Sequence, residues 1–428
     1  MNSVTFKDLG LSSQTLAVLE KKGFTTPTEI QSLVIPHALN SERDIIGKAA
    51  TGTGKTAAFG LPLLDRIKED CEHVQAVILA PTRELALQVC DELNSLKGNK
   101  RLNIIPVYGG ASIIPQIKQL RRNCHIVVGT PGRVIDHLKR KTVHFKNIEY
   151  FVLDEADEML NAGFLIEIKE ILANANKDRK TLCFSATMPS AILKLTQQYM
   201  KNPLLLETKN NDDSKANVIQ TFYEVKSSRE KRDALFRLID GADAFYGFIF
   251  CRTRREVDDV SDFLKEEGYP AEKLHGDISQ SQRERVLKLF KAQSCTIIVG
   301  TDVAARGIDV KDLTHVVNFS LPQTPESYVH RIGRTGRAGK SGAAMTLVTQ
   351  RERKTFQRML QVLRLNATRE NVPTNAQLQN RKEQQLDAEI KSLLKRGQHT
   401  RFEQLGKTLL EKYDAHQIVS GMAAMLLR

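Results

Sequence analysis

The chain has 428 residues, of which 41% are hydrophobic and 26% charged; this balance excludes wholesale disorder and a collagen-like chain. The length predicts two or three domains, and no apolar stretch reaches the roughly 18 residues typical of a membrane-spanning helix. Lys plus Arg number 63 and Asp plus Glu 50, a net charge of +13. That excess favours a polyanionic partner, although a solubilising surface gives the same sum. The first residues lack a basic segment followed by an apolar core, so we expect no signal peptide and a cytoplasmic protein.

The six cysteines are scattered and include no CxxC pair. This spacing argues against a structural zinc site, and a reduced compartment fits it better than a disulfide framework does. Several cysteines lie in apolar runs, as in Leu182-Cys183-Phe184, so we expect inert thiols in the core.

In chain order, short β-branched runs alternate with longer helical patterns, which is typical of parallel sheets with crossover helices. A first series of candidate strands comprises residues 44–47, 76–80, 103–108, 125–129, 150–153 and 181–184. A second series comprises residues 220–225, 247–251, 271–274, 296–300, 315–319 and 343–348. Between the two series the chain is polar and without apolar periodicity. We therefore expect α/β domains at 1–207 and 218–365, a linker at 208–217, and ligand binding at the carboxyl ends of the sheets.

After residue 365 the pattern changes to helices without strands. Three apolar stripes mark the expected helices: Leu386, Ile390, Leu393 and Leu394, then Leu405, Leu409, Leu410 and Tyr413, then Ile418, Met422, Met425 and Leu426. Thr400 with Glu403 predicts a capping box for the second helix, and Asp414 with Gln417 a cap for the third. Because roughly 60 residues make a poor independent core, segment 366–428 is expected to pack on the second domain or to pair with another copy. We favour dimerisation.

A phosphate-binding loop follows the first strand. Its glycines let backbone N–H groups curl around an anion, Lys55 reaches the β and γ phosphates, and the Thr56 hydroxyl can ligate Mg²⁺. The strict pattern has glycine where Ala49 stands, but Gly-Lys-Thr between a strand and a helix is a strong signal. The residues expected to bind the nucleotide here are Thr51, Gly52, Thr53, Gly54, Lys55 and Thr56.

A run of carboxylates supplies the other parts of a hydrolytic site. The apolar strand Tyr150-Phe151-Val152-Leu153 ends in Asp154, which can hold Mg²⁺ directly or through water, and Glu155 can act as base on the attacking water. A carboxylate run at a strand end is often only a solvated turn, but the upstream Gly-Lys-Thr favours catalysis.

Asp154-Glu155-Ala156-Asp157 is the signature of the DEAD-box RNA helicases, and the chain resembles that family over about residues 5–365. The resemblance implies two tandem RecA-like domains, ATP and Mg²⁺ as cofactors, and RNA as partner. It also implies a Q motif at residues 23–31, in which Phe24 packs near the base and Thr26 lies beside it. Gln31 would read the adenine edge, since a side-chain amide has one donor and one acceptor group.

Ser185-Ala186-Thr187 resembles the motif that couples hydrolysis to strand opening, with hydroxyls able to bond Asp157. Residues 301–309 and 330–337 match the family's later motifs. By resemblance, His330 couples the phosphate site to the carboxylates, and Asp309 lies near the ribose. Two arginine fingers, which raise rates by on the order of 10³–10⁵ in such enzymes, would be Arg334 and Arg337. Because they belong to the other domain, the resemblance implies an ATP site that exists only when the domains close.

The same resemblance implies an RNA track along both domains. The expected contacts are Arg83, Gly110, Thr130, Arg133, Arg252, Thr253, Gln280, Arg283 and Thr301. Hydroxyls, arginines and glycine N–H groups bind phosphates without reading bases, so binding should be largely sequence-independent. The chain has no tryptophan and only 6% aromatic residues, so no stacking platform is visible. The mechanism implied is local melting of short duplexes, driven by ATP binding and reset by hydrolysis.

The helical extension is similar to the dimerisation module of some bacterial DEAD-box proteins of the cold-shock type. Such relatives often continue into an RNA-binding domain or a basic tail, and neither appears before Arg428. The leading hypothesis is an ATP-dependent RNA helicase acting in ribosome assembly, cold adaptation or RNA decay. An RNA clamp with incidental turnover is disfavoured by the intact Glu155, Arg334 and Arg337. A DNA helicase of the wider superfamily is disfavoured by the residues of the Q motif and of the carboxylate motif.

Overall fold

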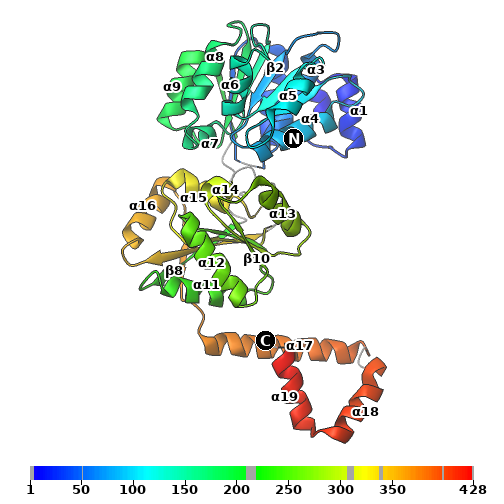
Figure 1. Cartoon of the computed structure of the whole chain (residues 1–428), viewed down its shortest axis with the longest axis vertical. Coiled ribbons are helices and arrows are strands. Elements are labelled where there is room, and N and C mark those ends of the chain that lie inside the picture. The colour runs from blue at the N-terminus through cyan, green and yellow to red at the C-terminus, as the bar shows by residue number, and fades with distance from the viewer. Residues whose placement is uncertain are drawn as a thin grey trace.

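The structure is a computed structural model, and it describes residues 4–50, 52–208, 218–305, 313–336, 341–397 and 400–426. Two α/β domains are stacked along the long axis of the molecule, and the C-terminal helices extend beyond the second domain (Figure 1). Of the predicted linker, only Thr208 lies within the described residues. None of the described helices is long and apolar enough to cross a membrane.

The first domain is built on a seven-stranded parallel sheet in the order β3-β4-β2-β5-β6-β1-β7. Its strands are β1 (Ile45–Lys48), β2 (Ala76–Leu79), β3 (Ile104–Val107), β4 (Ile126–Gly129), β5 (Tyr150–Leu153), β6 (Lys180–Ser185) and β7 (Leu204–Glu207). Successive residues of a strand face opposite sides, so Ile45 joins one hydrophobic cluster and Ile46 the other. Because both faces are buried, the central strands are uninterrupted apolar runs.

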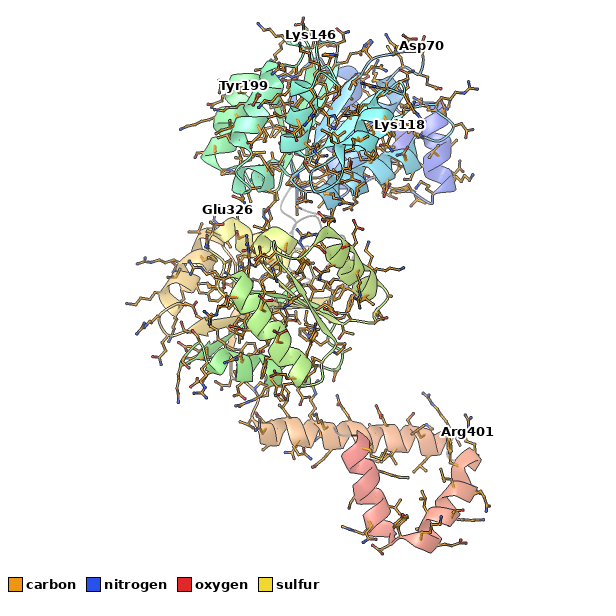
Figure 2. All side chains as sticks on the ribbon, viewed as in Figure 1. Asp70, Lys118, Lys146, Tyr199, Glu326 and Arg401 are labelled. Atoms are coloured by element: carbon orange, nitrogen blue, oxygen red, sulfur yellow. The ribbon has the colours of Figure 1, made fainter. Side chains whose placement is uncertain are left out.

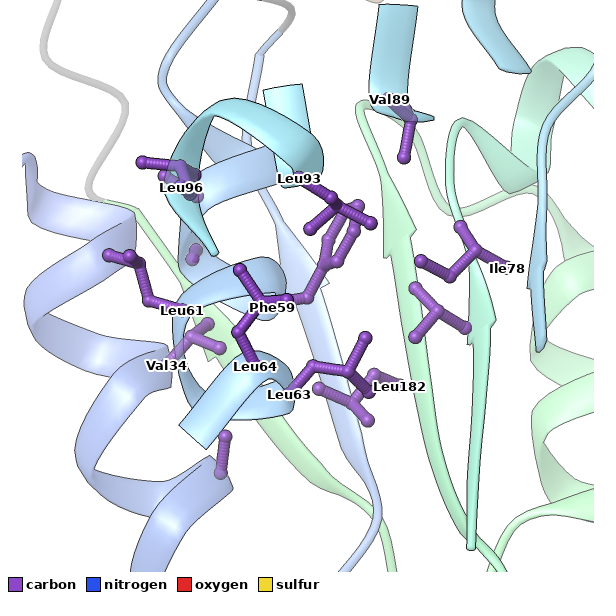
Figure 3. Close-up of a cluster of buried hydrophobic side chains, with 14 of the residues drawn as sticks. Val34, Phe59, Leu61, Leu63, Leu64, Ile78, Val89, Leu93, Leu96 and Leu182 are labelled. Carbon is purple, nitrogen blue, oxygen red and sulfur yellow. The ribbon is translucent and has the colours of Figure 1, made fainter. Parts of the chain in front are cut away.

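Helices cover both faces of this sheet (Figure 1). They are η1 (Phe6–Leu9), α1 (Ser13–Lys21), α2 (Glu29–Asn40), α3 (Lys55–Arg66), α4 (Arg83–Leu96), α5 (Ile113–Leu120), α6 (Pro131–Lys139), α7 (Ala156–Asn161), α8 (Leu165–Ala173) and α9 (Ser190–Tyr199). Figure 3 shows part of the core between α2, α3, α4 and the sheet. There the ring of Phe59 on α3 lies 5.3 Å from that of Phe184 on β6. The helix that follows the phosphate-binding loop is therefore fixed by the core beneath it.

The second domain repeats this topology in a seven-stranded sheet with the order β10-β11-β9-β12-β13-β8-β14. Its strands are β8 (Val218–Val225), β9 (Gly247–Phe250), β10 (Ala271–Leu274), β11 (Ile297–Gly300), β12 (His315–Asn318), β13 (Gly342–Thr349) and β14 (Thr368–Glu370). Its helices are α11 (Glu230–Asp240), α12 (Arg254–Glu266), α13 (Gln280–Lys291), α14 (Asp302–Ala305), α15 (Pro325–Ile332) and α16 (Arg353–Leu363). Replacing β8 by β1, β9 by β2 and so on gives the order of the first sheet, so equivalent loops of the two domains carry equivalent motifs.

The two strands that the sequence does not predict are β7 and β14, and each lies at an edge of its sheet. Leu205 in β7 is 55% exposed, and all three residues of β14 are exposed. β14 pairs with β8 in parallel, so the prediction of no strand after residue 365 is wrong for residues 368–370. An edge strand is paired on one side only, and these two lack the buried apolar run that marks the central strands.

The C-terminal extension contains α17 (Asn375–Lys395), the short 3-10 helix η2 (Thr400–Phe402), α18 (Glu403–Lys412) and α19 (Ala415–Leu426). Only the first half of α17 contacts the second domain: Leu378 is 7% exposed, and Lys382 lies 3.1 Å from Asp240. In Figure 2 the side chains of α18 and α19 point into open space. The prediction of a helical extension is confirmed.

The predicted capping box at Thr400 is wrong, because its hydroxyl donates to the carbonyl of Gly397 at 2.8 Å and α18 begins after Phe402 without a side-chain cap. Asp414 does cap α19, where it accepts a hydrogen bond from the backbone N–H of His416 at 3.0 Å.

Candidate functional site

The phosphate-binding loop joins β1 to α3 in the first domain. Gly52 and Gly54 have φ of 82° and 85°, a left-handed conformation that glycine adopts without strain. Gly54 precedes the first turn of α3, so the loop presents a helix N-terminus, where backbone N–H groups favour anions. Lys55 is 7% exposed, and its Nζ donates to the carbonyl of Ala49 at 3.1 Å. The Thr53 hydroxyl donates to Ala50 at 2.8 Å.

Thr56 is half-buried in the first turn of α3, and Thr51 lies outside the described residues. The described part of the loop therefore has the curled backbone and the lysine side chain that bind a triphosphate in such loops.

The Q-motif glutamine lies against this loop. The Gln31 side chain is 3% exposed; its Oε1 accepts from the N–H of Thr28 at 3.0 Å, and its Nε2 donates to the carbonyl of Gly54 at 3.2 Å. The adenine contact expected for Gln31 stays a prediction. Its link to the phosphate-binding loop was not predicted, because nothing in the sequence brings residues 31 and 54 together. Phe24 is 37% exposed and meets the ring of Phe6 edge-on, with centroids 6.4 Å apart. Thr26 is exposed.

The predicted magnesium carboxylate follows β5. Asp154 is 3% exposed, and its Oδ1 is buried without a hydrogen-bond partner among the described residues. Burial raises the pKa of Asp154 to about 7, against the opposing effect of Lys55. A buried carboxylate oxygen without a donor fits a divalent cation, which prefers oxygen ligands and would keep the group ionised. Glu155, the predicted base, is half-buried and has φ of 51°. That left-handed conformation costs a non-glycine residue about 1–2 kcal/mol.

Asp157 is the centre of a hydrogen-bond network. Its Oδ2 accepts from the backbone N–H and from the hydroxyl of Thr187, both at 2.8 Å. The Ser185 hydroxyl does not bond Asp157 but donates to the carbonyl of Thr187 at 2.6 Å. The expectation that both hydroxyls bond Asp157 therefore holds only for Thr187, while Ser185 supports the loop that carries it.

His330 joins this network from the second domain. Its Nε2 lies 3.5 Å from Asp157 Oδ2, and its Nδ1 contacts Glu158. Burial opposes a charge on His330, but the hydrogen bonds to Asp157 and Glu158 outweigh it and raise its pKa to about 9. Burial likewise works to raise the pKa of Asp157, and the hydrogen bond from His330 reverses this and lowers it. The role of Glu158 was not predicted, although this residue directly follows the four-residue signature.

A small pocket lies where the two domains meet. The residues that line it are Glu158, Phe250, Asp302, Ala305, Ser327, His330, Arg331 and Arg334. The predicted finger Arg334 thus lies near the His330 contact, whereas Arg337 and Asp309 lie outside the described residues.

Arg331, in the same motif as His330 and Arg334, has a structural role. Its side chain is 2% exposed, and its Nε and Nη2 donate to the carboxylate of Asp302 at 2.6 and 2.8 Å. Its Nη1 donates to Asn318 at 3.0 Å and to the carbonyl of Ser320 at 2.7 Å. Arg331 therefore joins the segments at the ends of two strands of the second domain, β11 and β12.

In the first domain, several predicted RNA contacts follow the ends of β2, β3 and β4. The Arg83 guanidinium lies 4.5 Å from the centre of the Tyr108 ring. Gly110 has φ of 75°, and Arg133 donates to the carbonyl of Ala111 at 3.0 Å. Thr130 precedes α6. These groups share one edge of the sheet, the edge that also carries the phosphate-binding loop.

The equivalent edge of the second domain carries the other predicted contacts. Arg252, Thr253 and Thr301 line one hollow, together with Arg254, Arg255, Gly276 and Val303. The Thr253 hydroxyl also caps α12 by accepting from the N–H of Glu256 at 3.1 Å. Gln280 donates to Glu284 at 3.3 Å.

Two ion pairs cross between the domains beside these contacts. Arg83 lies 2.7 Å from Glu284, and Arg283 lies 2.5 Å from Glu84. Each pair joins a predicted RNA-binding arginine to a glutamate of the other domain. The structure therefore brings the two halves of the track together, with carboxylates as partners that the sequence did not reveal.

Comparison with known families and structures identifies this arrangement. The family model described as DEAD/DEAH box helicase matches residues 28–195, and that of the helicase conserved C-terminal domain matches residues 230–339. The DEAD-box ATP-dependent RNA helicase CshA of Bacillus subtilis (strain 168) is 42% identical over 423 residues, covering 99% of this chain and 85% of its own length. CshA of Bacillus anthracis is 44% identical over 411 residues, covering 96% of this chain and 78% of its own length.

Solved structures of DEAD-box proteins are also similar to this chain, and their TM-scores differ with the placement of the two domains. A DEAD box protein of Methanococcus jannaschii is 48% identical, covers 86% of this chain and 99% of its own, and superposes with a TM-score of 0.51. Dbp5 of S. cerevisiae bound to RNA and ADP BeF3 is only 30% identical but has a TM-score of 0.77, covering 91% of this chain and 99% of its own. Mss116p bound to ssRNA and AMP-PNP is 28% identical with a TM-score of 0.79, covering 90% of this chain and 82% of its own.

A TM-score over two domains depends on how the domains are placed relative to each other. The domain arrangement of this chain is therefore closer to that of these two RNA-bound structures than to that of the M. jannaschii protein. The match also confirms the prediction of two tandem RecA-like domains. The chain belongs to the DEAD-box ATP-dependent RNA helicases, which bind RNA and hydrolyse ATP.

Proposed function

We propose that this helicase melts short RNA duplexes locally, and that closure of its two domains couples melting to ATP hydrolysis. The observation that carries the proposal is the contact of His330 with Asp157 and Glu158. This contact connects the second domain to the carboxylates of the phosphate site, and through Thr187 to the motif expected to couple hydrolysis to strand opening.

In the proposed ATP site, Lys55 binds the β and γ phosphates on the N-terminus of α3, and Glu155 takes the proton of the attacking water. Thr56 and Asp154 would hold Mg²⁺, which when bound offsets charge on the phosphates. Arg334 and Arg337 of the second domain stabilise the charge that develops on the γ-phosphate. Asp309 contacts the ribose, and Gln31, Phe24 and Thr26 select adenine.

The proposed RNA track uses side chains and N–H groups that bind the sugar-phosphate backbone. Because such groups do not read base edges, binding is largely independent of sequence. Closure brings the halves of the track together at the crossing ion pairs, and a strand held on both halves is bent away from its partner. Melting is then local, and hydrolysis resets the open arrangement.

The C-terminal extension is proposed to pair with a second copy of the chain rather than to cap the second domain. Beyond its docked first half, α17 exposes Leu393 to 47%. Further large apolar side chains stay exposed on α18 and α19, including Leu405, Leu410, Met422 and Met425. Light scattering should give a dimer for the natural sequence and a monomer for Leu393→Asp, with Gln384→Asp on the same helix as control. A monomeric mass for the natural sequence would rule out the dimer.

We place the protein in the cytoplasm, with a role in ribosome assembly, cold adaptation or RNA decay. All six cysteines are free thiols, which supports a reducing compartment. The role in cold adaptation rests on the resemblance of the C-terminal extension to that of cold-shock-type DEAD-box proteins and is an analogy.

Strand displacement from a short RNA duplex tests the helicase proposal. We expect ATP-dependent displacement, abolished by Glu155→Gln and strongly reduced by His330→Gln. Displacement that proceeds equally without ATP, or that is equal for a DNA duplex, would contradict it.

A further inference from the structure

Three of the proposed RNA contacts converge on the loop between β3 and α5. The ring of Tyr108 lies under the Arg83 guanidinium at 4.5 Å. Gly110 belongs to the loop, and Arg133 donates to the carbonyl of Ala111 at 3.0 Å. The position of this loop backbone therefore sets the position of all three contacts.

The buried side chain of Gln116 bonds this backbone at two residues. Gln116 on α5 is 5% exposed, whereas Lys118, labelled in Figure 2 on the same helix, is exposed. Gln116 Oε1 accepts from the N–H of Tyr108 at 3.1 Å, while its Nε2 donates to the carbonyls of Tyr108 at 3.1 Å and of Ser112 at 3.3 Å. The side-chain amide thus pairs with both backbone groups of Tyr108, as a neighbouring strand would.

His137 on α6 lies against this amide. It is fully buried, with Nε2 3.4 Å from Gln116 Oε1 and Nδ1 2.8 Å from the Thr142 hydroxyl. Burial lowers the pKa of His137 to about 4, so it is neutral at pH 7 and carries one N–H. The Thr142 hydroxyl has two acceptors within reach, Nδ1 and the carbonyl of His137 at 3.1 Å. When it donates to Nδ1, the N–H lies on Nε2 and donates to Gln116 Oε1, so that both donors and both acceptor sites of the amide are used.

We propose that Gln116 is a positioning residue for RNA binding: it fixes the Tyr108 backbone, and thereby Arg83, Gly110 and Arg133, in the geometry that receives consecutive phosphates. This inference rests on the RNA track proposed above and adds the side chain that pre-organises it. An apolar residue at this position would leave the half-buried backbone N–H and carbonyl of Tyr108 without their partner, and the loop would have to move to satisfy them.

The test is Gln116→Met, which keeps length and volume but removes the hydrogen bonds. Gln119→Met is the matched control, since it makes the same change on the exposed face of the same helix. In RNA-stimulated ATPase assays we expect the RNA concentration for half-maximal rate to rise roughly ten-fold for Gln116→Met, with the rate at saturating RNA changed by less than about two-fold. The slope of log RNA affinity against log salt should fall by about 1 for each phosphate that the variant no longer binds.

A purely structural role for Gln116 would lower the melting temperature and leave the RNA half-saturation and the salt slope unchanged, and that result would overturn the proposal. If Gln116→Met does not fold, Gln116→Glu can be used, which keeps the acceptor and loses both donors. An RNA affinity of Gln116→Glu equal to that of the unsubstituted protein would likewise overturn the proposal. Arg83→Gln separates the two proposals. If Arg83→Gln weakens RNA binding and Gln116→Met does not, the positioning role of Gln116 is refuted but the RNA track is not. If Arg83→Gln leaves RNA binding unchanged, the RNA track itself is refuted.

Discussion

Replacing His330 with glutamine removes the protonated imidazole that lies between Asp157 and Glu158 of the other domain. Asp302, Arg331 and Arg334 line the same pocket. In the closed arrangement the pKa of His330 is raised from its ordinary 6.5 to about 9. A raised pKa stabilises closure fully below pH 6.5, and this contribution is lost as the pH rises through about 9.

The size of the effect follows from the two pKa values. Protonation of His330 favours closure by about 3 kcal/mol at low pH. The closure constant should fall about seven-fold from pH 7 to pH 8, and about five-fold more by pH 9. Because the His330 side chain is buried and paired with two carboxylates, salt should weaken this pH dependence of closure less than it weakens a surface ion pair.

Closure can be followed by energy transfer between dyes on the two domains, with RNA and a non-hydrolysable ATP analogue, from pH 6 to pH 9.5. The natural sequence should open progressively above pH 7. His330→Gln should be more open at pH 7 and nearly independent of pH between 7 and 9. The same pH profile in both proteins would refute the assignment of the titration to His330.

Three further variants test other contacts. Gly54→Ala should weaken binding of a fluorescent ATP analogue at least ten-fold, because its Cβ would lie 2.5 Å from a glutamine amide; Gly163→Ala, with the same φ of +85° but open space, is the control and should bind normally. Thr187→Val removes a 2.8 Å hydrogen bond to the carboxylate network, and we expect it to reduce displacement more than ATPase; equal losses would contradict a coupling role. Arg331→Met leaves the buried Asn318 side chain and the Ser320 carbonyl without their common donor and should destabilise the second domain by about 1–3 kcal/mol, seen as a lower thermal midpoint; an unchanged midpoint would contradict this structural role.

The sequence predicts the central strands well because both of their faces are buried, so each appears as a continuous apolar run such as Ala76–Leu79. It does not predict β7 or β14, whose side chains are largely exposed. The capping box at Thr400 failed for a different reason: its hydroxyl has a competing acceptor at the end of the preceding helix.

The candidate site was predictable where a motif joins neighbours in sequence, as in the phosphate-binding loop and the carboxylate run. Contacts between distant segments were predicted only where the family resemblance supplied them, as between Asp157 and Thr187. Glu158 acts across the domain boundary on His330, and Gln31 reaches Gly54 from another helix. Gln116 belongs to an otherwise ordinary amphipathic helix, and only its buried partners distinguish it.

In the proposed mechanism, RNA-dependent closure of the two domains completes an ATP-hydrolysing site. Steady-state ATPase with RNA, with DNA and without nucleic acid, using ATP and an adenine-free triphosphate, tests this most directly. We predict turnover that RNA stimulates, that DNA does not, that is selective for ATP, and that Glu155→Gln abolishes. Equal stimulation by DNA, or full activity in Glu155→Gln, would contradict it.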